Sequence, residues 1–178
     1  MRSPFVKLVN DLLELVHLDA RNEPAKVELV DLNWLISYIV QLFTHRAKQQ
    51  QQQQLRIDLP SDLPRIETNP DILERILTEL LNNACKYTPE GESIQVNIET
   101  NAQTLKLIIA NSGIIISNLE LERIFDNFYR IPRQDPWQHG GTGLGLALVK
   151  KQVEYLGGTI SAHHHNQKLS LIVELPNL

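Results

Sequence analysis

Two short segments constrain this chain more than any other part of it. Residues 79–88 have the sequence ELLNNACKYT, and residues 141–146 have the sequence GTGLGL. On a helix, Glu79, Asn83 and Lys86 share one face, because side chains three and four positions apart are neighbours. A carboxylate, an amide oxygen and an ammonium group suit a water or metal ion, a metal ion and a phosphate, respectively. The second segment is a glycine-rich turn before an apolar stretch, where free N–H groups favour an anion. Together the two segments indicate a site for a nucleotide and Mg²⁺.

Apolar periodicity predicts five helices, and the residues beside them mark where several begin or end. Asp31 is placed to cap the second helix, Asn69 followed by Pro70 starts the third, and Gly157 stops the fifth. The glutamine tract at 49–54 is interpreted as the solvated end of the second helix. The predicted helices cover residues 5–19, 32–48, 70–87, 119–128 and 144–156.

Alternating or short apolar runs predict seven strands, at residues 27–32, 55–59, 65–68, 94–98, 105–110, 159–162 and 169–175, the last two forming a hairpin. Residues 20–26 predict a linker, and residues 129–142 a mobile loop. The order of elements indicates an α+β fold. We expect a two-layer α/β sandwich with a mixed, mostly antiparallel sheet and helices on one face.

The composition is that of an ordinary globular domain. The chain has 178 residues, 42% of them hydrophobic and 21% charged. Its net charge of −4 gives no indication of nucleic-acid binding. The single cysteine, Cys85, fits a reducing compartment, and no run is long enough to span a bilayer. A cytoplasmic location is therefore expected, although a parent protein with a membrane anchor is compatible with it.

The motifs and their order resemble the ATP-binding catalytic domain of bacterial sensor histidine kinases, members of the Bergerat-fold ATPases. The first segment resembles the family's N box. The matching stretches are residues 79–89, 111–113, 125–130 and 140–146, and residues 157–160 fit the strand after the last helix. No one of these is decisive, but four in the family order make coincidence improbable. The resemblance spans residues 28 to 175.

The resemblance implies two parts. Residues 1–22 would be the C-terminal part of a dimerisation and phosphoacceptor helix pair, and residues 23–178 the ATP-binding catalytic domain. None of the six histidines fits the acceptor motif, and His17 lies on what resembles the second helix of the pair. We expect the chain to begin inside that helix, to be a monomer, to bind nucleotide and not to phosphorylate itself.

The resemblance also assigns residues to the site. Glu79, Asn83 and Lys86 would be catalytic, with Mg²⁺ on Asn83 and Lys86 neutralising phosphate charge. Tyr87 would lie against the adenine of ATP. The other implied nucleotide-binding residues are Asn111, Gly113, Phe128, Gly141, Thr142, Gly143, Leu144, Gly145 and Leu146.

The chain departs from the family pattern after the fifth predicted strand. The family has Asp-x-Gly-x-Gly, whose Asp accepts a hydrogen bond from the adenine amino group; here Asn111 stands in its place and Ile115 replaces the second glycine. An Asn oxygen still accepts that bond, without the strength of a charged acceptor. A β-branched residue is costly if the turn needs a positive φ there.

Three functions of this fold stay open at this point. The leading one is transfer of the ATP γ-phosphoryl group to a histidine outside this chain, with a response regulator receiver domain as the next acceptor. Glu79 would then position the nucleophile, take its proton or support the metal. Because ATP-hydrolysing relatives carry Glu there, an ATP hydrolase is the second. A degenerate nucleotide-binding or signalling module is the third. A protein serine kinase of the same fold would lack the leading helix, which argues against that alternative.

Several other residues carry weaker hypotheses. Phe125 and Phe128 are expected to pack beneath the glycine-rich loop. Arg130 and Arg133 are interpreted as surface residues, and His139 in the loop has no clear partner. The triplet at 163–165 does not predict a metal site, because successive residues of an extended segment point to opposite sides; we expect it in a hairpin turn.

Overall fold

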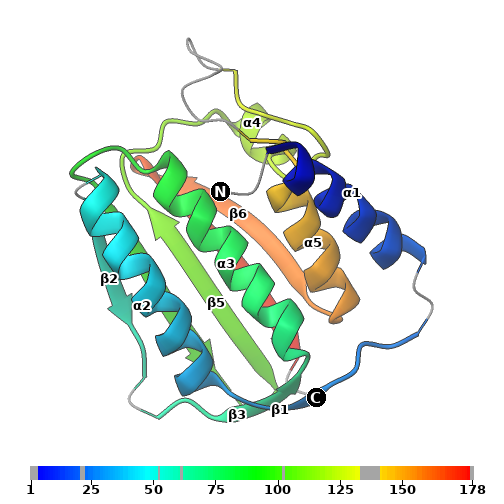
Figure 1. The fold of residues 1–178 in the computed structure, drawn as a ribbon. Helices are drawn as coiled ribbons and strands as arrows, with labels where there is room; N and C mark the ends of the chain where they lie inside the picture. The colour runs from blue at the N-terminus through cyan, green and yellow to red at the C-terminus, as the bar shows by residue number, and fades with distance from the viewer. Residues whose placement is uncertain are drawn as a thin grey trace.

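The computed structural model describes residues 4–20, 23–51, 53–60, 62–101, 103–132 and 141–176. A sheet forms one layer, and helices cover one of its faces (Figure 1). This is the two-layer α+β arrangement expected from the sequence. No helix within these ranges is both long and apolar enough to cross a membrane.

The main sheet has five strands in the order β2-β4-β5-β7-β6. Only the β2–β4 pair is parallel, so the prediction of a mixed, mostly antiparallel sheet is confirmed. The first and third strands pair antiparallel in a separate two-stranded sheet, which the sequence pattern did not predict. The strands are β1 (Glu28–Asp31), β2 (Gln54–Asp58), β3 (Arg65–Thr68), β4 (Ser93–Thr100), β5 (Thr104–Asn111), β6 (Thr159–His165) and β7 (Lys168–Pro176).

The central helix α3 (Pro70–Tyr87) carries most of the site. Leu73, Leu80 and Leu81 on its inner face are fully buried. Their packing fixes the rotation of the helix about its axis, so the opposite face points away from the core. The Asn69 side chain caps it by accepting from the Ile72 N–H at 3.0 Å. The other helices are α1 (Pro4–Ala20), α2 (Leu32–Gln51), α4 (Asn118–Arg123) and α5 (Gly145–Tyr155).

Two sequence predictions about element boundaries are wrong. The helix expected over residues 119–128 begins after a capping box between Ser117 and Glu120 and already ends at Arg123. The chain turns after that residue. The histidine triplet lies at the end of β6 and not in a turn. The turn is the next two residues, Asn166 and Gln167, whose φ angles of 49° and 58° match the twist of a two-residue hairpin.

The glutamine tract is also not simply a solvated helix end. α2 runs into it as far as Gln51, but Gln53 is 4% exposed. Its Nε2 donates to the carbonyl oxygens of Cys85 at 3.0 Å and Thr88 at 2.5 Å. The side chain therefore binds the last turn of α3 to the start of β2, so it stabilises the end of the helix that carries the N box.

Candidate functional site

Helix α3 places Glu79, Asn83 and Lys86 along one partly exposed face. All three are intermediate in burial, whereas Leu80 and Ala84 beside them are buried. The Asn83 side chain makes no hydrogen bond to any residue that the structure describes. Its amide is therefore available to a ligand, and it lies one helical turn from the carboxylate on one side and the ammonium group on the other.

The glycine-rich segment runs directly against this face. A Cβ added to Gly141 would lie 2.5 Å from Lys86 Nζ, and one added to Gly145 would lie 3.1 Å from Glu79 Oε2. α5 begins at Gly145, and its N-cap residue, Leu144, makes no side-chain hydrogen bond to the helix. The first N–H groups of the helix are therefore not capped by that side chain. Uncapped amides beside a lysine ammonium group form a surface that favours anions. The two segments singled out in the sequence thus meet in space.

A close backbone contact holds the glycine-rich segment in place. Gly143 has a φ of 72°, and its carbonyl oxygen accepts from the Phe128 N–H at 3.0 Å. A Cβ on Gly143 would lie 2.7 Å from the Phe128 carbonyl carbon. Phe128 itself has a φ of 64°, which is uncommon for a residue with a side chain.

The expectation that the Phe128 side chain packs beneath the loop is wrong. That side chain is 58% exposed, and it is the backbone of Phe128 that contacts the loop. Phe125, by contrast, packs partly buried against the core. Arg130 is exposed, as expected. Arg133, His139 and Gly140 lie outside the described residues.

The turn after β5 lies against the residues that follow the N box. Gly113 has a φ of 72°, and a Cβ there would lie 3.0 Å from Pro89 Cγ and 2.7 Å from Glu92 Cγ. Asn111, the last residue of β5, is 2% exposed. Ile115 is 82% exposed and is not among the described residues with a positive φ. The turn thus accommodates this β-branched residue without the strain considered from the sequence.

Lys86 is held by its neighbour at the end of α3. Its Nζ donates to the Tyr87 hydroxyl at 3.0 Å and lies 4.7 Å from the centre of the Tyr87 ring. This position keeps the ammonium group over the site and beside Gly141. On the opposite side of the loop, the Thr142 hydroxyl accepts from the Leu144 N–H at 3.3 Å.

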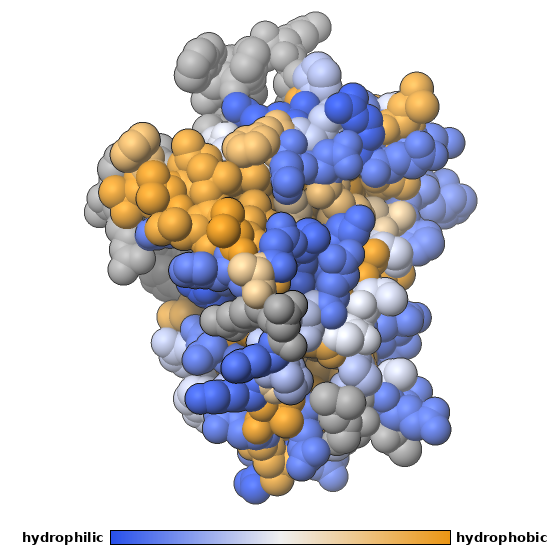
Figure 2. All heavy atoms as spheres, turned by 90° about the vertical axis from the view of Figure 1, so that its right-hand side faces the viewer, coloured by the Kyte–Doolittle hydropathy of each residue, from blue (hydrophilic) through white to orange (hydrophobic). Residues whose placement is uncertain are grey.

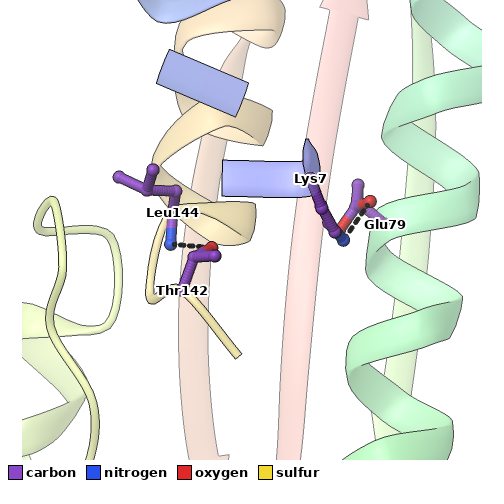
Figure 3. Close-up of polar contacts among 4 residues, drawn as sticks. All are labelled: Lys7, Glu79, Thr142 and Leu144. Atoms are coloured by element: carbon purple, nitrogen blue, oxygen red, sulfur yellow. Dashed lines mark hydrogen bonds and ion pairs between the residues drawn. The ribbon is translucent and has the colours of Figure 1, made fainter. Parts of the chain in front are cut away.

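The N-terminal helix adds a contact that the sequence pattern did not predict. Lys7 on α1 reaches Glu79 on α3, with its Nζ 3.0 Å from Oε1, close to Thr142 and Leu144 at the start of α5 (Figure 3). Leu15 on α1 packs with Leu144 and Leu148 in a small apolar cluster. A lysine in an otherwise apolar stretch was the only signal in the sequence that could have indicated this pairing. In the structure, Glu79 is thus engaged by a cation from α1.

Asp11 is the least favourable residue in the docking of α1. It is 8% exposed, and its Oδ2 is buried with no hydrogen-bond partner among the residues that the structure describes. Burial raises the pKa of this carboxyl above its ordinary value of 3.8; Lys7 and Arg75 oppose the shift, while Glu79 and Glu14 add to it. The folded state therefore binds this proton more readily than the unfolded state.

The consequence for stability depends on pH. The contribution of Asp11 to folding is present below pH 3.8 and is lost as the pH rises through its raised pKa. We therefore expect Asp11→Asn, which stays neutral, to raise the melting temperature at pH 7 by roughly 2–4 °C. The gain should shrink as the pH approaches 4, because the wild-type carboxyl is then protonated too.

Calorimetric melting of both proteins between pH 4 and pH 7 checks this expectation. Glu122→Gln, which removes an exposed carboxylate from α4, is the control for lost negative charge and should show no such trend. A melting difference for Asp11→Asn that is constant across the range would contradict the assigned cause.

The histidine triplet has local partners. A ring nitrogen of His164 lies 2.9 Å from the Ile114 carbonyl oxygen, and one of His163 lies 3.3 Å from the Ser161 hydroxyl. Within the described ranges, no three His, Cys, Asp or Glu side chains are grouped so that they could hold a metal ion. A metal in this site would therefore depend on an amide such as that of Asn83 and on oxygens of the ligand.

Comparison with known proteins agrees with this geometry. Residues 68–177, which contain the N box, the Asn111 turn and the glycine-rich segment, match the family described as histidine kinase-, DNA gyrase B-, and HSP90-like ATPases. The chain belongs to this family. It is the type of catalytic domain found in sensor histidine kinases.

Individual relatives narrow the placement within the family. The sensor histidine kinase WalK of Bacillus subtilis (strain 168) is 33% identical over 88% of this chain and 26% of its own length. Full-length ShkA in complex with AMPPNP superposes with a TM-score of 0.83 at 25% identity, over 97% of this chain and 35% of that one. Histidine kinase ThkA in complex with the response regulator protein TrrA shares the fold, with a TM-score of 0.77 at 21% identity over 98% and 48% of the two chains.

The catalytic domain spans only about a quarter of the curated relative's length. The leading helix α1 lies before the matched family range of 68–177, as do β1, α2 and β2, and β3 ends at its first residue. Full-length ShkA covers 97% of this chain, so its likeness extends to these segments as well.

Proposed function

We propose that this catalytic domain binds Mg²⁺-ATP and transfers its γ-phosphoryl group to a histidine that another domain supplies. The observation that carries the proposal is the convergence of three groups from two segments that are distant in the sequence, helix α3 and the start of α5. The Asn83 amide, the Lys86 ammonium group and the uncapped start of α5 all border one face of α3. Cation, amide oxygen and aligned N–H groups are the donor set that a triphosphate with a hard cation requires.

Each residue would then have a defined part. Lys86, fixed by Tyr87, would neutralise charge on the phosphates, and the N–H groups of Gly143, Gly145 and Leu146 would bind their oxygens. Asn83 would hold the metal through its side-chain oxygen; when bound, Mg²⁺ supplies neutralisation of the developing phosphate charge. Tyr87 would lie against the base, and Asn111 would hydrogen-bond its edge.

Phosphoryl transfer requires mainly positioning of the reactants and neutralisation of their charge. The role of Glu79 in that positioning depends on α1, because Lys7 of α1 forms an ion pair with it. While Lys7 Nζ lies 3.0 Å from its Oε1, the Glu79 carboxylate is occupied by this ion pair. Departure of α1 from this face would leave Glu79 facing the start of α5, where it would orient or deprotonate the incoming histidine.

The outer face of α1 suits another helix. Phe5, Leu13 and Val16 are 71%, 52% and 62% exposed, and the side of the molecule that carries α1 shows gathered apolar side chains (Figure 2). We infer that this face packs in the dimerisation and phosphoacceptor region of the parent kinase, with a receiver domain as the later phosphate acceptor. The structure of ThkA in complex with the response regulator protein TrrA supports a receiver domain as a partner. The reaction would take place in the cytoplasm.

The test has three readouts on one preparation. Calorimetric titration with ATP in excess Mg²⁺ should show saturable binding. With labelled ATP, this chain should acquire no stable phosphohistidine, His17 included, but should label an added helix-pair phosphoacceptor domain. Steady release of phosphate would favour the hydrolase alternative instead. Absence of binding to folded protein would favour a degenerate signalling module.

A further inference from the structure

The Asn111 side chain has an unusual environment at the end of β5. It is 2% exposed, and its Nδ2 is buried with no hydrogen-bond partner among the described residues. A buried donor without a partner destabilises the folded state, and folded proteins contain few of them. Such a group calls for an acceptor that the described part of the chain does not supply.

The amide belongs to the nucleotide site proposed above, and the inference rests on that proposal. Asn111 pairs in register with Ile94 on β4 and Leu169 on β7, so neighbouring strands fix its backbone on both sides. Two residues later, Gly113 lies against Pro89, just beyond the last turn of α3. The unpartnered donor is therefore positioned by rigid elements next to the part of α3 that ends in Lys86 and Tyr87.

The chemistry of an amide differs from that of a carboxylate in one decisive respect. A carboxylate at this position only accepts hydrogen bonds, whereas an amide accepts at Oδ1 and donates at Nδ2. Adenine presents an amino donor beside the N1 acceptor. Guanine presents the O6 acceptor beside the N1–H donor. A carboxylate therefore matches the adenine amino group and faces the guanine O6 with a repulsive pair of lone pairs.

An amide can pair with either edge. In one orientation Oδ1 accepts from the adenine amino group and Nδ2 donates to N1. Turned over by 180°, Nδ2 donates to guanine O6 and Oδ1 accepts from N1–H. In both cases the buried donor gains a partner that none of the described residues provides. We propose that Asn111 sets the base preference of this site, and that it lets the domain bind guanine as well as adenine nucleotides.

The experiment is a calorimetric titration with ATP and with GTP, both in excess Mg²⁺. For the wild-type chain the dissociation constant of GTP should lie within about tenfold of that of ATP. Asn111→Asp keeps the size of the side chain and removes the donor. It should raise the ratio of the GTP dissociation constant to the ATP dissociation constant at least about tenfold, mainly by weakening the binding of GTP. Asn101→Asp is the matched control, in the turn between β4 and β5. The Asn101 oxygen accepts from the N–H groups of Gln103 and Thr104, so an aspartate there keeps both bonds and the ratio should not change.

Two results would overturn the inference while leaving the proposed function intact. One is ATP binding by the wild-type chain with GTP more than about tenfold weaker. The other is an unchanged ratio in folded Asn111→Asp. If neither nucleotide binds, the proposed function fails together with the inference. The wild-type ratio decides the question even if Asn111→Asp does not fold.

Discussion

Replacing Asn83 with alanine is expected to weaken Mg²⁺-ATP binding by roughly tenfold to 100-fold, or about 1.4–2.7 kcal/mol. The physical reason is that Asn83 is the only amide of the N box face between Glu79 and Lys86, and a hard cation prefers such an oxygen. Titration of wild-type and variant chains by calorimetry, with Mg²⁺ and with EDTA, measures the effect. Without Mg²⁺ the two proteins should bind ATP equally weakly.

Stability should not follow the loss of binding. Asn83 makes no side-chain hydrogen bond to a described residue, and alanine is the better helix former by a few tenths of a kcal/mol. The melting temperature of Asn83→Ala should therefore equal or exceed that of the wild type. Asn82→Ala is the matched control, because it removes the same atoms about 100° further around the helix. Equal binding by all three chains would exclude Asn83 as the metal-binding residue.

The sequence predicted most of the fold because its elements are marked by local signals. The cap at Asn69, the proline after it and the apolar period of α3 all agree, and the helix begins and ends where they predict. The prediction for 119–128 failed because the turn after Arg123 depends on a contact between Phe128 and Gly143, fifteen residues apart. Periodicity over a short window cannot show such a contact.

Local sequence signals predicted the parts of the site, as they predicted the elements of the fold, but not the contacts between distant residues. Spacing on one helix placed Glu79, Asn83 and Lys86 together, and the glycine-rich segment followed from its own composition. The Lys7–Glu79 pair joins residues 72 positions apart, and the docking of α1 that creates it depends on Leu15 meeting Leu144 and Leu148. No short pattern specifies a pair at that separation. This tertiary contact decides whether the Glu79 carboxylate is paired with Lys7.

Replacing Gly143 with alanine is expected to abolish measurable nucleotide binding in a chain that still folds. A left-handed φ costs a residue with a Cβ about 1–2 kcal/mol. In addition, the new Cβ would lie 2.7 Å and 2.9 Å from backbone atoms of Phe128, which cannot move without breaking the hydrogen bond between the two residues. The start of α5 would shift relative to Lys86, and binding should fall by roughly 100-fold or more, or about 2.7 kcal/mol.

Gly91→Ala separates the two causes. Gly91 has a φ of 79°, but a Cβ there would meet no atom within 4 Å, so alanine introduces the same backbone cost without a clash. Both variants should lose stability by about 1–2 kcal/mol through the φ term, as urea unfolding would show. Only Gly143→Ala should lose binding to ATP in calorimetry. If the two variants bind alike, the contact between Gly143 and Phe128 does not position the glycine-rich segment, and the start of α5 must be held by the packing of Leu144 and Leu148 on Leu15 instead.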